Sequence, residues 1–152
     1  YHVAGILDSH LYKNEAGKIY LKNKQQNISI SHSLNFTAVA LSKNIIGFDL
    51  QCYSDKIVRV SKRFLSMQEL IKIKPFESIH SLTRAWTIKE AIYKAYGQKG
   101  IQFNRQIEID IESPKEEIQL SKAKMIHNLT ETHYEIYSQL HADFSWSLAQ
   151  EV

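Results

Sequence analysis

Residues 86–94 read WTIKEAIYK and carry the densest pattern of chemically useful side chains in the sequence. In a helix, residues four apart share one face, so Trp86, Glu90 and Lys94 would form a line. A carboxylate in such a line can bind a hard cation, and an ammonium group can bind phosphate oxygens. The same spacing also fits an ordinary exposed Glu–Lys pair beside a packed tryptophan.

A second carboxylate, that of Asp49, lies inside the apolar run from Ile45 to Leu50. Burying an unpaired carboxylate is costly, so Asp49 is expected to have a partner. One solution is a turn at the end of a strand, which the aspartate would cap. The other is a cation shared with Glu90, because magnesium binds one or two carboxylates together with phosphate oxygens and water.

Two further groups of side chains could contact phosphate. Ser31, His32 and Ser33 can donate hydrogen bonds to phosphate oxygens, and Lys18 follows Gly17 in a predicted turn. Each group also fits a structural role, as a hydrogen-bonded loop histidine or a solvated lysine. The sequence has no glycine-rich phosphate loop, no zinc-spaced Cys/His set and no nucleophile elbow.

These side chains need elements to position them, and the first third of the chain predicts strands. Alternating or continuous apolar patterns indicate strands within residues 17–21, 27–33, 36–41 and 45–50. A period of two returns after Gly100, and it indicates strands around residues 107–111, 134–136 and 144–148.

The middle of the chain predicts helices. Apolar residues recur at helical spacing after Ser54, and the sequence SMQE at 66–69 has the form of a capping box. Residues 79–96 contain no glycine or proline, and Gly97 follows where a C-terminal capping glycine belongs. These patterns predict an α+β fold with mainly antiparallel strands and one long central helix.

The composition limits the classes of protein that fit. The chain has 152 residues, of which 43% are hydrophobic, and we expect one domain over residues 1–152. Its 19 Lys and Arg against 16 Asp and Glu fit a phosphate-bearing ligand or an acidic protein partner better than nucleic acid. Cys52 is the single cysteine, so no intrachain disulfide is expected. Because no apolar run reaches about 18 residues, we expect a cytoplasmic protein without membrane contact.

Three segments resemble, in order and spacing, the motifs of the 4′-phosphopantetheinyl transferase superfamily, and of its surfactin-synthetase-activating type in particular. They are Ser31-His32-Ser33, the GFDLQ sequence at 47–51, and the 86–94 segment with Gly97. The resemblance covers roughly residues 17 to 103 and implies a monomer with a pseudo-twofold fold. The implied enzyme moves 4′-phosphopantetheine from coenzyme A to a serine of an apo acyl or peptidyl carrier protein and releases 3′,5′-adenosine bisphosphate.

The resemblance also implies roles for single residues. Asp49 and Glu90 would hold Mg²⁺, and Gln51 stands where the family has a third acid, so an amide oxygen would replace a charged ligand. Glu90 would also accept the proton of the carrier serine, and Lys94 would stabilise charge on the departing phosphate. Contacts to coenzyme A phosphates are implied for Lys18, Ser31, His32, Lys89 and Lys94.

A carrier protein with an acidic helix needs a basic surface on which to dock. Lys56, Arg59 and Arg63 follow Asp49 at spacings of three and four residues, so a helix would gather them on one face. A solvated helix face accounts for the same spacing equally well.

Departures from the family pattern leave a second function open. Ile19 stands where the family usually has proline, and 16 residues precede Gly17, so the first half of the domain is expected to be shortened. Together with Gln51, these features also fit a catalytically silent module that binds coenzyme A or a carrier domain. A third hypothesis, a small nucleic-acid-binding protein, has no readout motif to support it.

Overall fold

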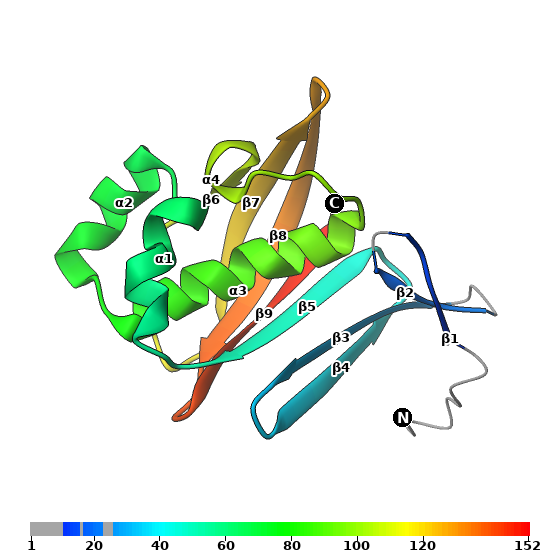
Figure 1. Cartoon of the computed structure of the whole chain (residues 1–152), viewed down its shortest axis with the longest axis horizontal. Helices are drawn as coiled ribbons and strands as arrows, with labels where there is room; N and C mark the ends of the chain where they lie inside the picture. The colour runs from blue at the N-terminus through cyan, green and yellow to red at the C-terminus, as the bar shows by residue number, and fades with distance from the viewer. Residues whose placement is uncertain (1–10, 16, 23–25) are drawn as a thin grey trace.

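The computed structural model describes residues 11–15, 17–22 and 26–152, and its main layer is a five-stranded sheet (Figure 1). The strand order is β5-β9-β8-β7-β6, so β5 and β6 form the two edges. Every strand pair recorded among these residues is antiparallel. The strands of this sheet are β5 (Ile46–Cys52), β6 (Ile107–Ile109), β7 (Gln119–His127), β8 (Thr130–Leu140) and β9 (Phe144–Glu151).

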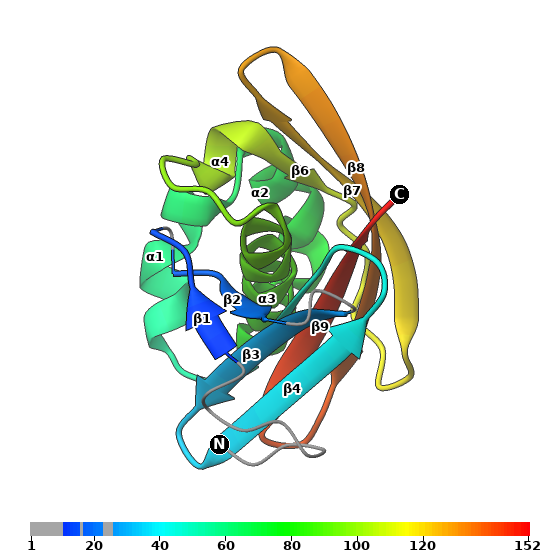
Figure 2. The same ribbon diagram turned by 90° about the vertical axis from the view of Figure 1, so that its right-hand side faces the viewer.

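Helix α3 (Ile79–Tyr96) lies across one face of the sheet, and Figure 2 shows it nearly end-on. Ser78 caps its first turn, because the Ser78 hydroxyl accepts a hydrogen bond from the Ser81 amide at 3.1 Å. Gly97, at φ 70°, ends the helix in the left-handed conformation that glycine adopts at little cost. The predicted helix 79–96 and the predicted α+β class are both confirmed.

Small residues in the sheet allow α3 to approach closely. A Cβ atom at Gly47 of β5 would lie 1.9 Å from the carbonyl oxygen of Ala91, so no larger residue fits there without moving the helix. Ser147 of β9 is fully buried under the helix, and its hydroxyl oxygen lies 2.8 Å from that of Thr87. The large side chain of Trp146, next along the strand, is only half-buried.

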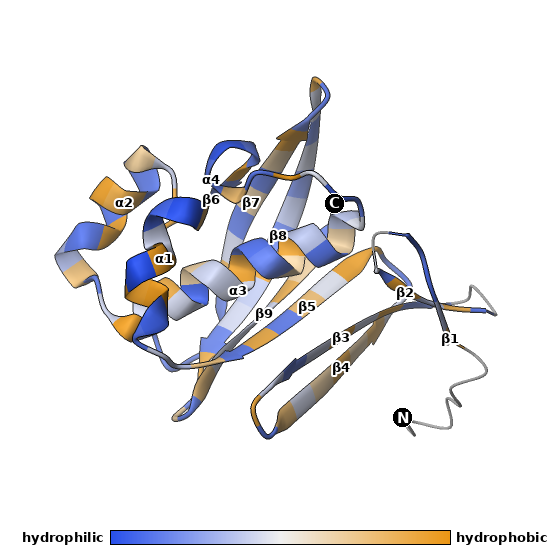
Figure 3. Cartoon of the chain, in the orientation of Figure 1, coloured by the Kyte–Doolittle hydropathy of each residue, from blue (hydrophilic) through white to orange (hydrophobic). Residues whose placement is uncertain are grey.

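Short helices gather beside the N-terminal half of α3 (Figure 1). The capping box predicted at 66–69 is confirmed: the Ser66 hydroxyl accepts from the Glu69 amide at 3.2 Å, and the Glu69 carboxylate accepts from the Ser66 amide at 2.7 Å. Hydrophobic and hydrophilic residues alternate around α1, as expected of a helix with one buried face (Figure 3). These helices are α1 (Lys56–Phe64), α2 (Met67–Ile73), the 3-10 helix Lys74–Phe76, and α4 (Phe103–Gln106).

Two hairpins precede the sheet, β1 (Leu11–Lys13) with β2 (Ile19–Leu21), and β3 (Asn27–Ser33) with β4 (Phe36–Ser42). β3 runs beside the free edge of β5 (Figure 1), but the two strands are joined through side chains. Alternate serine hydroxyls of β3 accept hydrogen bonds from alternate amides of β5. The pairs are Ser29 with Phe48, Ser31 with Leu50 and Ser33 with Cys52, at 2.8, 3.1 and 3.0 Å.

Most predicted strands are present, and the structure differs from the prediction at β1, β6 and β7. β6 ends at Ile109, so Ile111 lies outside it, and β1 and β7 were not predicted. The pseudo-twofold arrangement and the single-domain organisation stay predictions. No helix in the described part of the chain has the length and apolar character needed to cross a membrane.

Candidate active site

A cavity of about 740 Å³ is bounded by α3, β5, β3 and the β1–β2 hairpin. It contains most of the residues to which the sequence assigned chemistry. Those that line it are Ser31, His32, Asp49, Gln51, Glu90 and Lys94. Residues separated by up to 63 positions along the chain, from Ser31 to Lys94, therefore meet at one place.

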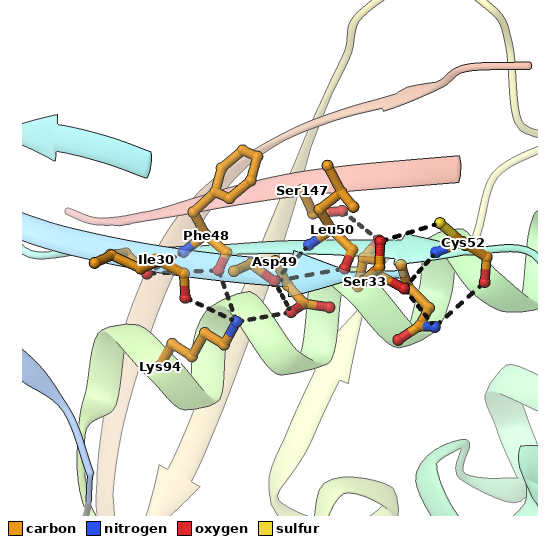
Figure 4. Close-up of polar contacts among 12 residues, drawn as sticks. Ile30, Ser33, Phe48, Asp49, Leu50, Cys52, Lys94 and Ser147 are labelled. Carbon is orange, nitrogen blue, oxygen red and sulfur yellow. Dashed lines mark hydrogen bonds and ion pairs between the residues drawn. The ribbon is translucent and has the colours of Figure 1, made fainter. Parts of the chain in front are cut away.

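The Asp49 carboxylate is buried and only half satisfied. Its Oδ1 atom accepts a hydrogen bond from the Ser31 hydroxyl at 2.9 Å. The same atom accepts a hydrogen bond from the Lys94 ammonium at 2.8 Å (Figure 4). Its Oδ2 atom is buried and has no hydrogen-bond partner among the residues that the structure describes. Burial raises the pKa of Asp49 above its usual value, against the opposing effect of Lys94. An orphaned carboxylate oxygen beside a cavity is suited to a cation or a hydrogen-bond donor from a ligand.

The Glu90 carboxylate lies one helical turn before Lys94 on α3 and is half-buried in the same cavity. Burial, and then the negative charge of Asp49, raise the pKa of Glu90 to about 7, while Lys94 lowers it. A negative charge on Asp49 makes ionisation of the neighbouring Glu90 carboxyl less favourable. Near neutral pH, Glu90 therefore exists in both protonation states.

The ammonium group of Lys94 joins α3 to the two strands beside it. In addition to Asp49, it donates to the carbonyl oxygens of Phe48 at 3.1 Å and Ile30 at 3.4 Å (Figure 4). Its side chain keeps 29% of its surface exposed, in contrast to the 9% of Asp49. Lys94 thus reaches the cavity and remains accessible to a ligand.

Gln51 lies on the wall of the cavity next to Asp49. Its amide nitrogen donates to the Ser33 hydroxyl at 3.1 Å and to the Cys52 carbonyl oxygen at 3.3 Å. These two bonds fix the amide plane, and the amide oxygen is the atom of Gln51 that could serve as a metal ligand.

Ser31 and His32 both line the cavity. The Ser31 hydroxyl donates to Asp49 at 2.9 Å and has the Leu50 carbonyl oxygen as a second, longer acceptor at 3.4 Å, so its expected phosphate contact stays a prediction. Ser31 thus orients the Asp49 carboxylate. His32 is exposed and lines the cavity, where its imidazole could meet a phosphate.

Lys18 lies at the C-terminal end of α3. Its ammonium group donates to the carbonyl oxygen of Ala95 and sits 5.6 Å from the centre of the Tyr20 ring. A cation is favourable there because the last carbonyls of a helix carry partial negative charge. Lys18 lines a smaller cavity of about 220 Å³ that Glu90 and Lys94 also border, so its expected phosphate contact stays a prediction.

Lys89 is not among the residues that line this cavity, and its expected contact with coenzyme A phosphate stays a prediction. Its side chain is fully buried and forms an ion pair with Glu69 at 2.7 Å. Its other two donors go to the carbonyl oxygens of Ile107 at 2.8 Å and Phe103 at 3.1 Å. All three N–H groups are used inside the protein, so Lys89 has a structural role.

The basic residues Lys56, Arg59 and Arg63 are exposed on α1, as the helical spacing predicted. The side chain of Trp86 connects this helix to the cavity, because it forms part of the cavity wall and contacts Phe64 of α1 with ring centres 5.2 Å apart. Sequence reasoning treated Trp86 only as a packed residue. It also missed the cavity wall formed by Leu11, Tyr12 and Lys13, because a three-residue strand has no detectable period.

The family model of the 4′-phosphopantetheinyl transferase superfamily matches residues 45–149 of this chain. The chain belongs to the 4′-phosphopantetheinyl transferase superfamily. The matched range includes Asp49, Gln51, Glu90 and Lys94 but begins after Ser31.

A curated relative within this superfamily is the 4′-phosphopantetheinyl transferase gsp of Aneurinibacillus migulanus. It is 29% identical to the chain over 89 residues, which are 57% of this chain and 37% of that protein. The chain thus matches a little more than a third of the length of the relative.

Proposed function

We propose that this chain transfers 4′-phosphopantetheine from coenzyme A to a serine of an apo acyl or peptidyl carrier protein. The observation that carries the proposal is the meeting of Asp49, Glu90 and Lys94 in one cavity, where one buried carboxylate oxygen has no partner from residues 11–15, 17–22 and 26–152. Membership of the transferase superfamily supports phosphopantetheine transfer as the reaction of this cavity.

A magnesium ion fits the donor set of this cavity. The unpaired Asp49 oxygen, the Glu90 carboxylate and the Gln51 amide oxygen are hard donors of the kind Mg²⁺ binds. When bound, the ion supplies positive charge that neutralises the pyrophosphate of coenzyme A.

The transfer forms a bond between the carrier serine oxygen and the β-phosphorus and breaks the bond from that phosphorus to the oxygen of the α-phosphate. Glu90 accepts the serine proton as the general base. Lys94 stabilises the charge that develops on the departing 3′,5′-adenosine bisphosphate. His32, exposed at the cavity, donates to a phosphate oxygen.

The carrier protein docks on α1 in this proposal. Lys56, Arg59 and Arg63 are exposed on that helix, which directly follows β5 and its Asp49. A row of basic residues complements an acidic helix and orients the approach of the carrier.

The test is incubation of the protein with coenzyme A, Mg²⁺ and several apo carrier proteins, followed by intact mass measurement of each carrier. We expect a carrier to gain the mass of one phosphopantetheine. Glu90→Gln should lose most of this transfer, whereas the matched control Glu77→Gln, on an exposed carboxylate, should retain it. No mass gain with any carrier would contradict the proposal.

The alternative is a silent module that binds coenzyme A without transferring its arm, and Gln51 is the observation that favours it. The site offers two carboxylates where the family has three acids. Calorimetric binding of coenzyme A by a protein that modifies no carrier would support this alternative.

A further inference from the structure

The carboxylate that the proposed function assigns to Mg²⁺ already holds a cation, the ammonium group of Lys94. Its nitrogen lies 2.8 Å from Asp49 Oδ1, the distance of a direct ion pair. Burial alone would make an unpaired Asp49 carboxylate costly, so Lys94 stabilises its charge in the metal-free protein. The two cations, ammonium and metal, therefore compete for the same negative charge.

The contacts of Lys94 allow it to leave. Apart from Asp49, its partners among the described residues are the carbonyl oxygens of Phe48 and Ile30, at 3.1 and 3.4 Å, of which the second is a long hydrogen bond. Its side chain is 29% exposed, so water or a phosphate oxygen can replace these acceptors. Lys89 on the same helix lacks this freedom, since its side chain is fully buried.

We propose that Lys94 is an exchangeable counter-ion, which neutralises Asp49 in the metal-free protein and moves from Asp49 to a ligand phosphate when a divalent cation binds. This inference rests on the proposed function only in taking the ligand phosphate to be that of coenzyme A. It follows that Lys94 opposes metal binding in the absence of coenzyme A. Because the phosphates of coenzyme A offer Lys94 a new partner, metal and coenzyme A should each strengthen the binding of the other.

The experiment is a calorimetric titration of the metal-free protein with Mn²⁺, without coenzyme A or carrier protein. We expect Lys94→Met to bind Mn²⁺ about tenfold more tightly than the native chain, since a competing positive charge is removed from the carboxylate. The matched control is Lys13→Met, which removes the same charge from the wall of the same cavity, and it should change the affinity less than about twofold.

If Lys94→Met does not fold, Lys94→Gln replaces it, because the amide can still donate to the Phe48 carbonyl oxygen without carrying charge. Equal or weaker Mn²⁺ binding in the folded variant overturns the inference, as does an equal gain in Lys13→Met. Undetectable Mn²⁺ binding in all proteins overturns it too.

A second measurement follows the amine itself. The rate at which a small acylating reagent modifies Lys94, read by peptide mass, should rise about threefold or more on adding Mg²⁺, while the rate at Lys13 stays constant. An unchanged Lys94 rate contradicts the displacement. Neither measurement uses carrier transfer, so a chain that transfers nothing but shows both effects would refute the proposed function and leave the counter-ion exchange standing.

Discussion

Helix α3 carries two lysines that pair with buried carboxylates, and the two pairs differ in completeness. The Glu69 carboxylate receives Lys89 and the Ser66 amide on Oε2, at 2.7 Å each, and the Ile109 amide on Oε1 at 3.0 Å. Within the described part of the chain, the Asp49 carboxylate receives its partners on Oδ1, and its Oδ2 atom has none.

This difference separates a structural ion pair from a ligand site. A buried network in which every donor and acceptor is used has nothing to offer a ligand, and it holds its elements in one arrangement. A buried carboxylate with a free oxygen, next to a cavity and a partly exposed ammonium, stays costly until something binds. Charge and spacing alone do not distinguish Lys89 from Lys94, whereas the count of satisfied atoms does.

The largest expected effect on stability concerns the Glu69–Lys89 pair, in which both carboxylate oxygens have partners. Lys89→Met leaves the Glu69 charge buried without its counter-ion, so we expect it to lower the free energy of unfolding by about 3–5 kcal/mol. Urea unfolding of both proteins at neutral pH measures this. The control Lys74→Met breaks an exposed Lys–Glu pair and should change stability by less than about 1 kcal/mol. A similarly small loss for Lys89→Met would remove the distinction between the two pairs.

The next effect concerns Glu90 and depends on pH. The folded protein holds the Glu90 proton up to a pKa of about 7, whereas the unfolded chain releases it near 4.5. Stability contributed by this group is therefore full below pH 4.5 and falls as the pH rises toward 7. In metal-free buffer, Glu90→Gln should be more stable than the native chain by roughly 2–3 kcal/mol at pH 8 and about equal at pH 4. Chemical unfolding at both pH values tests this, and a difference independent of pH would contradict it.

A smaller change in stability is expected at the Asp49–Lys94 pair. Asp49→Asn removes a charge that the free protein only half satisfies, so the free energy of unfolding should change by about 1 kcal/mol or less. Mn²⁺ binding, in contrast, should weaken roughly tenfold or more, because one of two carboxylates is lost. Asp110→Asn, on an exposed acid, serves as the control for both measurements. Large destabilisation of Asp49→Asn with retained metal binding would show that Asp49 has a structural role and not a role in metal binding.

The smallest effect is expected at Gln51. Gln51→Glu adds a negative donor beside Asp49, but it removes the two bonds that the amide nitrogen makes to Ser33 and to the Cys52 carbonyl oxygen. These effects oppose each other, so Mn²⁺ affinity should rise by no more than about fivefold. Calorimetry against the exposed control Gln68→Glu measures the change. A gain far above this would show that Gln51 limits the native site, as in the silent-module alternative.

The sequence predicts those parts of the fold that depend on local signals. Helix α3 was predicted with its observed bounds, because a run without glycine or proline ends at Gly97. Strand β7 was missed because its buried positions are Gln119, Ser121, Ala123 and Met125, which form no apolar alternation.

The sequence predicted several residues of the candidate site, but it did not predict their hydrogen-bond and ion-pair partners. Motif residues at 49, 90 and 94 do line one cavity. The roles of Ser31 and Lys89 depend on partners 18 and 20 positions away, Asp49 and Glu69, and no local pattern identifies such pairs. The alternation of Ser29, Ser31 and Ser33 predicted a strand, but it did not predict that their hydroxyls would accept hydrogen bonds from the amides of β5.

The Glu69–Lys89 pair has a consequence for how copies of this protein behave toward one another. β6 is an edge strand, and the outward Ile107 carbonyl oxygen and Ile109 amide are the groups that an incoming strand from another molecule would use. Lys89 occupies the first and Glu69 the second. The Glu69–Lys89 pair thus prevents a strand from another molecule from adding to the edge of the sheet at β6. Loss of the pair would favour aggregation at high concentration even where the remaining fold survives.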